Sequence, residues 1–295
     1  MTSAASAGTW RLGDLTVNRI GFGAMRLTGR AAFGSGKRDP KQAVAVLRRA
    51  IELGVNHIDT AAFYFTDELA ANDLIARALA PYPDDLVITT KVWPGRRRVS
   101  GNWWWATPAQ LRDQVEENLR MLGRDRLDVV NLRVPGSRRD GSIAEHFGAL
   151  AELREAGLIR HLGVSNVTAA QLAEAQSIAP VVCVQNAFGI GAPAAERELL
   201  RVCGEQGIAY VPFFAIAGAG RESGAVTGEP EAVEEIARAR GASPAQVRLA
   251  WTLAQGPHVL AIPGTGDLGH LAENVAAGEL RLTGEDLARL NALGG

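Results

Sequence analysis

Several residue types are scarce in this chain of 295 residues. It contains two cysteines, Cys183 and Cys203, and only three tyrosines and three lysines. The cysteines lie in apolar runs without the spacing of metal ligands, so we expect buried free thiols and no metal site. No uninterrupted apolar run is long enough to cross a membrane, and the first eight residues lack the basic and apolar regions of a signal peptide. These absences predict a cytoplasmic protein.

The charge of the chain is almost balanced. It has 31 basic and 32 acidic residues, which gives a formal net charge of −1. A balance of this kind argues against a nucleic-acid or membrane-surface partner. Hydrophobic residues make up 47% of the chain, which is enough for a large core. We therefore expect a protein that binds a small molecule, as a monomer or a weak homo-oligomer.

Apolar runs rich in valine, isoleucine and leucine alternate with amphipathic segments along the chain. The expected strands are 20–25, 55–59, 86–92, 127–134, 161–165, 181–185, 208–213 and 259–262. The expected helices begin near 40 and span about 67–80, 108–122, 143–156, 169–178, 194–206, 229–239, 244–254, 268–276 and 284–293. Helix-capping residues precede five of them, namely Asp39, Thr107, Thr168, Ser243 and Thr283.

Eight strands that are each followed by a helix indicate one (β/α)₈ barrel over residues 1–295. We expect a frayed tail over residues 1–8 and a β-hairpin over residues 9–18, turning at Gly13-Asp14. A doubly wound sheet is the alternative, and it usually carries a glycine fingerprint in its first βα turn. The nearest candidate, Gly218-Ala219-Gly220, lies late in the chain, and its neighbours do not complete the fingerprint.

Polar side chains follow the ends of six of the expected strands. They are Asp59 with Tyr64, Lys91, Asn131 with Arg133, Ser165 with Asn166, Gln185 with Asn186, and Gly264 with Thr265. In a barrel these positions converge on one face, where the chemistry of such folds is located. The sequence therefore predicts a functional site at the carboxyl ends of the strands.

Three of these residues suggest an acidic phenol. An ammonium beside a phenol favours the phenolate and lowers the pKa of the phenol. We expect Lys91 to act on Tyr64 in this way, and Asp59 to keep Lys91 charged and oriented. Tyr64 would then donate a proton to an oxygen that gains negative charge, such as a carbonyl oxygen receiving a hydride.

These motifs resemble those of the aldo-keto reductases. The resemblance covers nearly the whole chain and keeps the motifs in order. It rests on Gly54–Tyr64 with its Ile-Asp-Thr-Ala core, Lys91, Gly163–Asn166, Val184–Asn186, and Ile262–Thr265 through Glu273-Asn274. It implies a barrel that binds NADPH in an extended form, without a dinucleotide-binding sheet, and that reduces aldehydes or ketones.

The resemblance also implies roles for single residues. Tyr64 would be the general acid, Lys91 the partner that lowers its pKa, and Asp59 the residue that holds Lys91. The cofactor residues would be Ser165, Asn166 and Gln185 at the nicotinamide carboxamide, Phe213 against the nicotinamide ring, Thr265 and His270 near the adenosine 2′-phosphate, and Glu273 and Asn274 at the adenine.

The chain departs from the family pattern at two positions. Arg133 stands where the family usually has a histidine, and Gly264 stands where many members carry a lysine for the cofactor phosphate. The stretch 128–134 that contains Arg133 is similar to that of the bacterial pyridoxal reductases within this family, as are 182–186 and 209–214. The resemblance implies reduction of pyridoxal or a similar aromatic aldehyde. Arg133 would orient the carbonyl or hold a neighbouring phenolate, or else pair with Asp59 or another carboxylate.

The substrate pocket is expected to include Met25 and the run Trp103, Trp104 and Trp105. Three consecutive tryptophans cannot all face inward, so at least one should offer a flat surface to an aromatic substrate. The chain stops soon after its last helix, so we expect a fairly open site. Two alternatives remain, a ketone or imine reductase of secondary metabolism and a non-catalytic NADPH-binding regulatory subunit. The loops 93–106 and 215–228 would decide the first of these.

Overall fold

The chain folds around a curled parallel sheet. The computed structural model describes residues 2–29, 38–136, 140–216 and 229–294. Seven strands follow one another in the order β11-β10-β9-β8-β5-β4-β3, and every neighbouring pair is parallel. Their bounds are β3 Phe22–Gly23, β4 His57–Asp59, β5 Val87–Val92, β8 Leu127–Arg133, β9 Ile159–Ser165, β10 Val181–Gln185 and β11 Ala209–Tyr210.

The segment expected as the eighth strand, 259–262, closes the sheet into a barrel. It pairs with both edges in parallel, through the bridges Tyr210↔Val259 and Ile20↔Ala261. Its backbone is also bonded on both sides, since the Leu260 amide donates to Tyr210 O and the Gly21 amide donates to Ala261 O. The predicted (β/α)₈ barrel is therefore confirmed, with β3 shorter than expected because a 3₁₀ turn, Ala24–Arg26, follows it at once.

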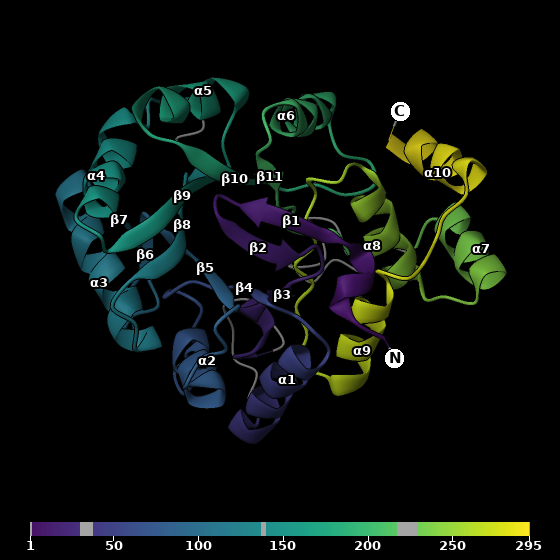
Figure 1. Cartoon of the computed structure of the whole chain (residues 1–295), viewed down its shortest axis with the longest axis horizontal. Helices are drawn as coiled ribbons and strands as arrows, with labels where there is room; N and C mark the ends of the chain where they lie inside the picture. Colours follow the sequence, from purple (N-terminus) through teal and green to yellow (C-terminus); the bar gives the residue numbers. More distant parts are fainter. Residues whose placement is uncertain (1, 30–37, 137–139, 217–228, 295) are drawn as a thin grey trace.

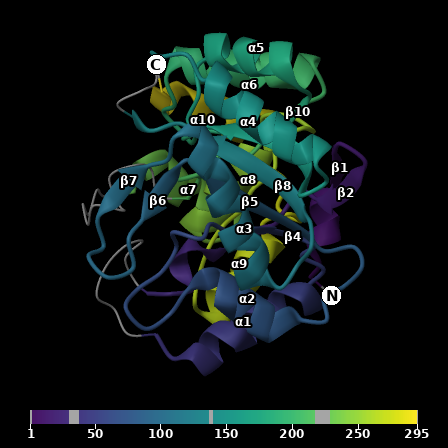
Figure 2. The same ribbon diagram turned by 90° about the vertical axis from the view of Figure 1, so that its left-hand side faces the viewer.

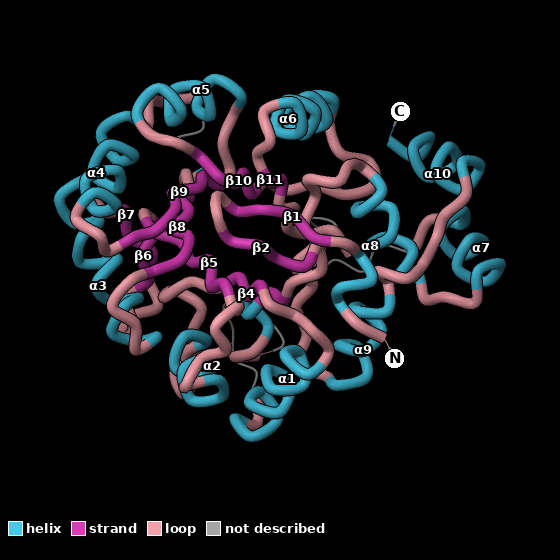
Figure 3. Tube along the Cα trace, viewed as in Figure 1, coloured by secondary structure: helices cyan, strands magenta, loops and turns pink. Residues whose placement is uncertain are grey.

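Helices surround this barrel (Figure 1; Figure 3). Their bounds are α1 Pro40–Glu52, α2 Ala71–Leu79, α3 Leu111–Leu122, α4 Ala144–Glu155, α5 Ala169–Ile178, α6 Ala194–Glu205, α7 Glu231–Arg240, α8 Pro244–Ala254, α9 Leu268–Ala276 and α10 Gly284–Asn291. The predicted caps form, since Asp39 accepts from the Lys41 amide and Thr168, Ser243 and Thr283 each make a capping box. Each helix buries apolar residues, and α7 and α10 lie on the outside, where α7 packs on α8 and α10 packs on α7 (Figure 1).

The predicted hairpin lies across one end of the barrel. Its strands are β1 Thr9–Leu12 and β2 Leu15–Asn18, which pair in an antiparallel register. Leu12 and Val17 are fully buried, in a cluster with barrel residues that include Val129 and Leu260. Figure 2 shows this hairpin at one end of the barrel and a second hairpin, β6 Pro94–Arg96 with β7 Trp103–Trp105, at the other end. One end is therefore plugged, and the site must open at the other.

The expectation of a frayed tail over residues 1–8 was wrong. Ala4–Ala7 form a 3₁₀ helix that Ser3 caps, and Ala4 is fully buried. The Ala4 amide donates to Leu53 O, and the Arg19 guanidinium donates to Ala7 O and to Val259 O. The small alanine side chains allow this close packing.

Helix α2 begins four residues later than expected. The Thr66 amide donates to Leu69 O, which makes a turn, and the Ala71 amide donates to Tyr64 O. The residues between β4 and α2 are therefore a tight loop that carries Tyr64. This loop, rather than an extra turn of helix, fixes the backbone of Tyr64.

Two further observations concern the expected absences. No helix within residues 2–29, 38–136, 140–216 and 229–294 has the length and apolarity to span a membrane. Cys183 and Cys203 are free and buried, as predicted. The glycine candidate Gly218–Gly220, and the part of the loop 215–228 that begins at residue 217, lie outside the described residues.

The buried His57 predicts an acid-sensitive fold. Burial lowers the pKa of His57 to about 4, with the charge of Asp59 opposing the shift, and its Nε2 lies 3.1 Å from Thr89 Oγ1. The unfolded chain then binds more protons than the folded one between about pH 6.5 and 4, so stability falls as the pH falls through that window.

Replacing His57 tests this account. Between pH 7 and pH 5, the unfolding free energy of the wild type should fall by about 2 kcal/mol more than that of His57→Gln, measured by urea denaturation. His270→Gln, an exposed control, should leave that loss unchanged; an equal loss in wild type and His57→Gln would contradict this account.

Candidate active site

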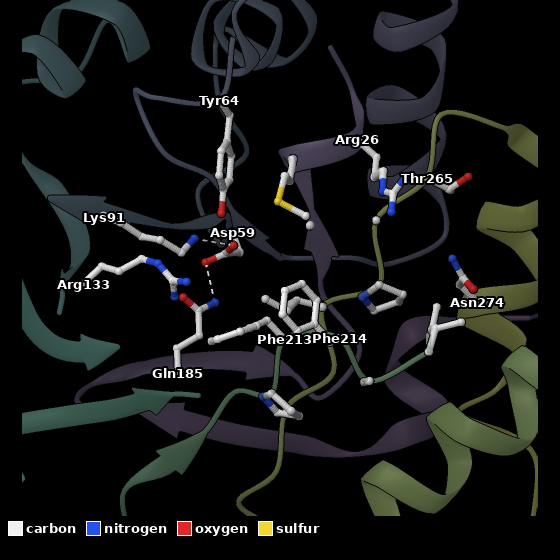
Figure 4. Close-up of a pocket in the computed structure, with 18 of the residues that line it drawn as sticks. Arg26, Asp59, Tyr64, Lys91, Arg133, Gln185, Phe213, Phe214, Thr265 and Asn274 are labelled. Carbon is white, nitrogen blue, oxygen red and sulfur yellow. Dashed lines mark hydrogen bonds and ion pairs between the residues drawn. The ribbon is translucent and has the colours of Figure 1, made fainter. Parts of the chain in front are cut away.

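A cavity of about 1050 Å³ opens beside the carboxyl ends of the barrel strands. Most of the residues predicted for the site line it, namely Met25, Asp59, Tyr64, Lys91, Trp103, Trp105, Arg133, Asn166, Gln185, Phe213, Gly264, Thr265, His270, Glu273 and Asn274. In Figure 4 Tyr64 and Lys91 lie on one side, the two phenylalanines lie in the middle, and Thr265 and Asn274 lie on the opposite side. The residues expected to donate the proton and those expected to bind the adenosine therefore lie at opposite ends of the cavity.

A buried ion pair occupies the chemical end. Lys91 Nζ lies 2.6 Å from Asp59 Oδ1, and it also donates to Thr60 O at 3.0 Å. Gln185 Nε2 donates to the second carboxylate oxygen, Asp59 Oδ2, at 2.9 Å. Lys91 and Asp59 are only 3% and 4% exposed, so little water reaches these contacts. Gln185 thus orients Asp59, a role that the sequence did not predict.

Tyr64 completes this group. It is buried, and its hydroxyl points toward Lys91 and Asp59 (Figure 4). Lys91 Nζ lies 5.0 Å from the centroid of the Tyr64 ring. The backbone bonds of Tyr64 to Ala61 and Ala71 hold the phenol in this direction. The three residues predicted to act together therefore meet, from the end of β4, the loop after it and the end of β5.

The two pKa shifts show which protonation states this group favours. Burial raises the pKa of Tyr64, and the nearby charge of Lys91 only partly offsets that effect. Burial works to lower the pKa of Lys91, but Asp59 and Tyr64 together outweigh it, so the pKa of Lys91 is raised. The expectation of a lowered pKa for Tyr64 was wrong in its net direction, because the loss of water contributes more than the ammonium. At neutral pH the phenol keeps its proton and Lys91 keeps its charge.

A second buried network supports the ion pair from behind. Thr60 Oγ1 donates to Asn72 Oδ1, and Asn72 Nδ2 donates to Asn118 Oδ1, which also accepts from Thr90 Oγ1. Asn118 in turn donates to Gln114 O. Sequence reasoning missed these residues. A signal was present, since Gln114 and Asn118 are polar residues one helical turn apart on the apolar face of α3.

Arg133 lines the cavity and also binds Ser165, the last residue of β9. Its Nη1 donates to Ser165 Oγ at 2.9 Å, and its guanidinium carbon lies 4.8 Å from the centroid of the Phe213 ring. Ser165 is fully buried and does not line the cavity, unlike its neighbour Asn166. The contact of Ser165 with the nicotinamide carboxamide stays a prediction. In this structure the Ser165 hydroxyl orients Arg133.

The tryptophan run forms strand β7 of the hairpin at the mouth. Trp103 and Trp105 line the cavity and are 40% and 47% exposed. Trp104 points to the other face, where it packs on Gly95, and a Cβ on Gly95 would lie 2.3 Å from its indole. The assignment of Trp104 to the pocket was therefore wrong. Alternation along a strand separates the three side chains.

Two arginines that the sequence did not single out line the opposite end. Arg26 follows β3 and Arg38 precedes α1, and both border the cavity with Thr265 and Gly266. Arg26 was identifiable in principle, because it follows a predicted strand end as the other site residues do. Within the described ranges, no group of three or more His, Cys, Asp or Glu residues is placed to hold a metal ion.

Comparison with known proteins adds independent evidence. The model of the aldo/keto reductase family matches residues 19–294. The chain is 44% identical to the pyridoxine 4-dehydrogenase of Escherichia coli over 98% of this chain and 99% of that one. It is also similar to a crystal structure of a thermostable aldo-keto reductase bound to the inhibitor epalrestat, at 32% identity and a TM-score of 0.79 over 97% of this chain and 99% of that one. An aldo-keto reductase from Klebsiella pneumoniae in complex with NADPH is similar at 30% identity and a TM-score of 0.79, over 97% and 94% of the two chains.

Proposed function

This chain belongs to the aldo/keto reductase family and is an oxidoreductase, and from that premise we propose that it uses NADPH to reduce pyridoxal or a similar aromatic aldehyde, with Tyr64 as the proton donor. The observation that carries the proposal is the position of Arg133 in the same cavity as Tyr64 and the buried Lys91–Asp59 pair. The ion pair supports carbonyl reduction in general. Arg133 supports a particular class of carbonyl.

The shape and lining of the cavity fit NADPH. Its wall includes Gly23, Gly264 and Gly266, which all border the cavity. The Phe213 ring lies in the middle of the cavity, and the buried Asn274 lies at the end opposite Tyr64 (Figure 4). We assign Asn166 and Gln185 to the carboxamide, Phe213 to the nicotinamide ring, and Thr265, His270, Glu273 and Asn274 to the adenosine. When bound, NADPH would supply a hydride to the carbonyl carbon of the substrate.

The residues of this chain supply the proton and the charge balance. As negative charge develops on the carbonyl oxygen, the Tyr64 hydroxyl transfers its proton to that oxygen. The charge of Lys91 stabilises the phenolate that remains, and Asp59 keeps Lys91 protonated in a site with little water. The raised pKa of Tyr64, caused by its burial, keeps the proton available at neutral pH. The rate of reduction should therefore fall only at alkaline pH, where the phenol loses its proton.

Arg133 and the aromatic walls support an aromatic aldehyde with an acidic group. Trp103 packs edge-on against Phe63, with ring centroids 5.5 Å apart, and both line the cavity near Tyr64. These rings offer flat apolar surfaces to a substrate ring. Pyridoxal carries an acidic hydroxyl ortho to its aldehyde, and a guanidinium is suited to hold the phenolate. The similarity to an enzyme described as pyridoxine 4-dehydrogenase supports the same substrate class.

Two other functions remain candidates. A ketone or imine reductase would use the same proton donor, so a panel of carbonyl and imine substrates followed by NADPH absorbance separates it from an aldehyde reductase. Turnover of ketones or imines without turnover of pyridoxal would overturn the substrate assignment and leave the reductase assignment standing. A non-catalytic regulatory subunit would bind NADPH without turnover of any substrate.

Removing the Tyr64 hydroxyl tests the catalytic role directly. We expect Tyr64→Phe to lower kcat by about 10² to 10⁴, which is the usual contribution of a general acid. NADPH affinity, measured by quenching of tryptophan fluorescence, should change by less than about twofold, because the phenol does not contribute to cofactor binding. Tyr82→Phe is a matched control, since Tyr82 donates to Leu122 O outside the cavity. Unchanged turnover in Tyr64→Phe would remove Tyr64 from the mechanism.

Removing the guanidinium tests the substrate class. We expect Arg133→Met to lower kcat/KM for pyridoxal by roughly ten- to a hundredfold, the effect of losing a charge-assisted hydrogen bond. The loss should be much smaller for pyridine-4-carbaldehyde, which has no ortho hydroxyl for Arg133 to hold. Arg133→Lys should restore part of the activity toward pyridoxal. Equal losses for the two aldehydes would mean that Arg133 acts only by positioning Ser165 and Phe213, and the assignment of the substrate anion would be wrong.

A further inference from the structure

Positive charge gathers at the end of the cavity farthest from the proton donor. Arg26 and Arg38 both line this end, beside Thr265, Gly266 and His270. Figure 4 shows Arg26 next to Thr265, on the side of the cavity opposite Lys91. The carboxylate of Glu229, which also lines the cavity, is paired with Arg248 at 2.5 Å. This end is therefore suited to an anion.

Two glycines, Gly264 and Gly266, determine which position can supply a positive charge at this end of the cavity. An added Cβ at Gly264 would lie 2.4 Å from Gly23 O, a backbone atom that cannot move aside, because β3 and the closing strand meet here. Position 264 therefore cannot carry a long cationic side chain in this backbone. An added Cβ at Gly266 would lie 1.7 Å from Arg38 Nη1. The absence of a side chain at Gly266 is what lets the Arg38 guanidinium lie against the cavity wall.

A hydrogen bond to the backbone of Gly266 holds the Arg38 guanidinium against the cavity wall. Its Nη1 donates to Gly266 O at 2.8 Å, and Gln42 Nε2 donates to the same oxygen at 2.8 Å. The pKa of Asp267 is lowered, first by the hydrogen bond from the His270 amide and also by the charge of Arg38. Arg38 therefore lies close to the first turn of α9, where Asp267 is the N-cap and Thr265 and His270 border the cavity.

We infer that Arg38 binds the 2′-phosphate of the cofactor and sets the preference for NADPH over NADH. This inference rests on the proposed function for the identity of the cofactor. A guanidinium offers several donors in a planar fork that matches a phosphate, and it keeps its charge at any physiological pH. The Thr265 hydroxyl lies on the same side of the cavity and can donate to the same negative group (Figure 4). Arg38, which directly precedes the N-cap of α1, thus supplies the positive charge that the backbone contact at Gly264 excludes from position 264.

The test compares two nucleotides that differ only in the 2′-phosphate. Adenosine 2′,5′-bisphosphate and adenosine 5′-monophosphate are titrated calorimetrically into the full-length protein without cofactor. We expect Arg38→Ala to weaken binding of the bisphosphate by roughly ten- to a hundredfold, and binding of the monophosphate by less than about twofold. Arg38→Lys should retain part of the affinity. In turnover assays the KM for NADPH should rise while kcat and the KM for NADH stay the same.

Arg49→Ala is the matched control, because Arg49 lies on α1, the helix that Arg38 precedes, is exposed, and pairs with Glu52 outside the cavity. It should leave the affinity for both nucleotides unchanged, and thermal unfolding confirms that each variant folds. An equal loss for both nucleotides in Arg38→Ala, or no loss for either, would overturn the inference. Failure of the wild type to reduce pyridoxal would sink only the proposed substrate, since the nucleotide titrations do not depend on it.

Discussion

Lys91 and Asp59 form an ion pair that is almost completely removed from water, and the geometry of the site depends on it. Burying either charge alone would cost several kilocalories per mole, so each must satisfy the other and find further hydrogen bonds. The barrel meets this requirement because Thr60 O and the Gln185 amide come from the ends of β4 and β10, two strands of the parallel sheet whose carboxyl ends converge on the same end of the barrel. A phenol placed against this pair meets a fixed positive charge in a dry environment. That environment, more than any single motif, makes carbonyl reduction possible here.

The parts of the structure that depend on local sequence were predictable. Capping residues such as Thr168 and Ser243, and the buried valine-rich strands, carry their information within a few residues, so the barrel followed from their order. The side on which a residue lies was harder to predict. Asn166 has a left-handed φ of 59°, so the chain turns after Ser165, and strand alternation could not show which of the two enters the cavity. Trp104 was misplaced because the hairpin that contains it was not recognised. The net pKa shift of Tyr64 depends on how deeply it is buried, and sequence does not report depth.

The cavity has an arginine at each end, and each end is suited to a different anion. Arg133 lies over Phe213 and beside Ser165, close to where a substrate would meet Tyr64. Arg38 lies against Gly266 at the far end. Both arginines relate to positions where the chain departs from the family pattern, and close backbone packing explains the second departure. The contact between Gly264 and Gly23 leaves no room for a side chain. Specificity for substrate and for cofactor would then be set independently, at sites separated by the length of the cavity.

The ionisation of Tyr64 is the most direct test of the central claim that Lys91 and Asp59 create the proton donor. The chain has only three tyrosines, so ¹³C labelling at the tyrosine ζ carbon gives a spectrum that Tyr64→Phe can assign. The pKa of Tyr64 should lie above its ordinary value in the wild type, because burial outweighs the charge of Lys91. It should rise further in the double variant Lys91→Met, Asp59→Asn, which removes the ammonium without leaving a lone buried carboxylate. An unchanged or lower pKa in the double variant would contradict the account.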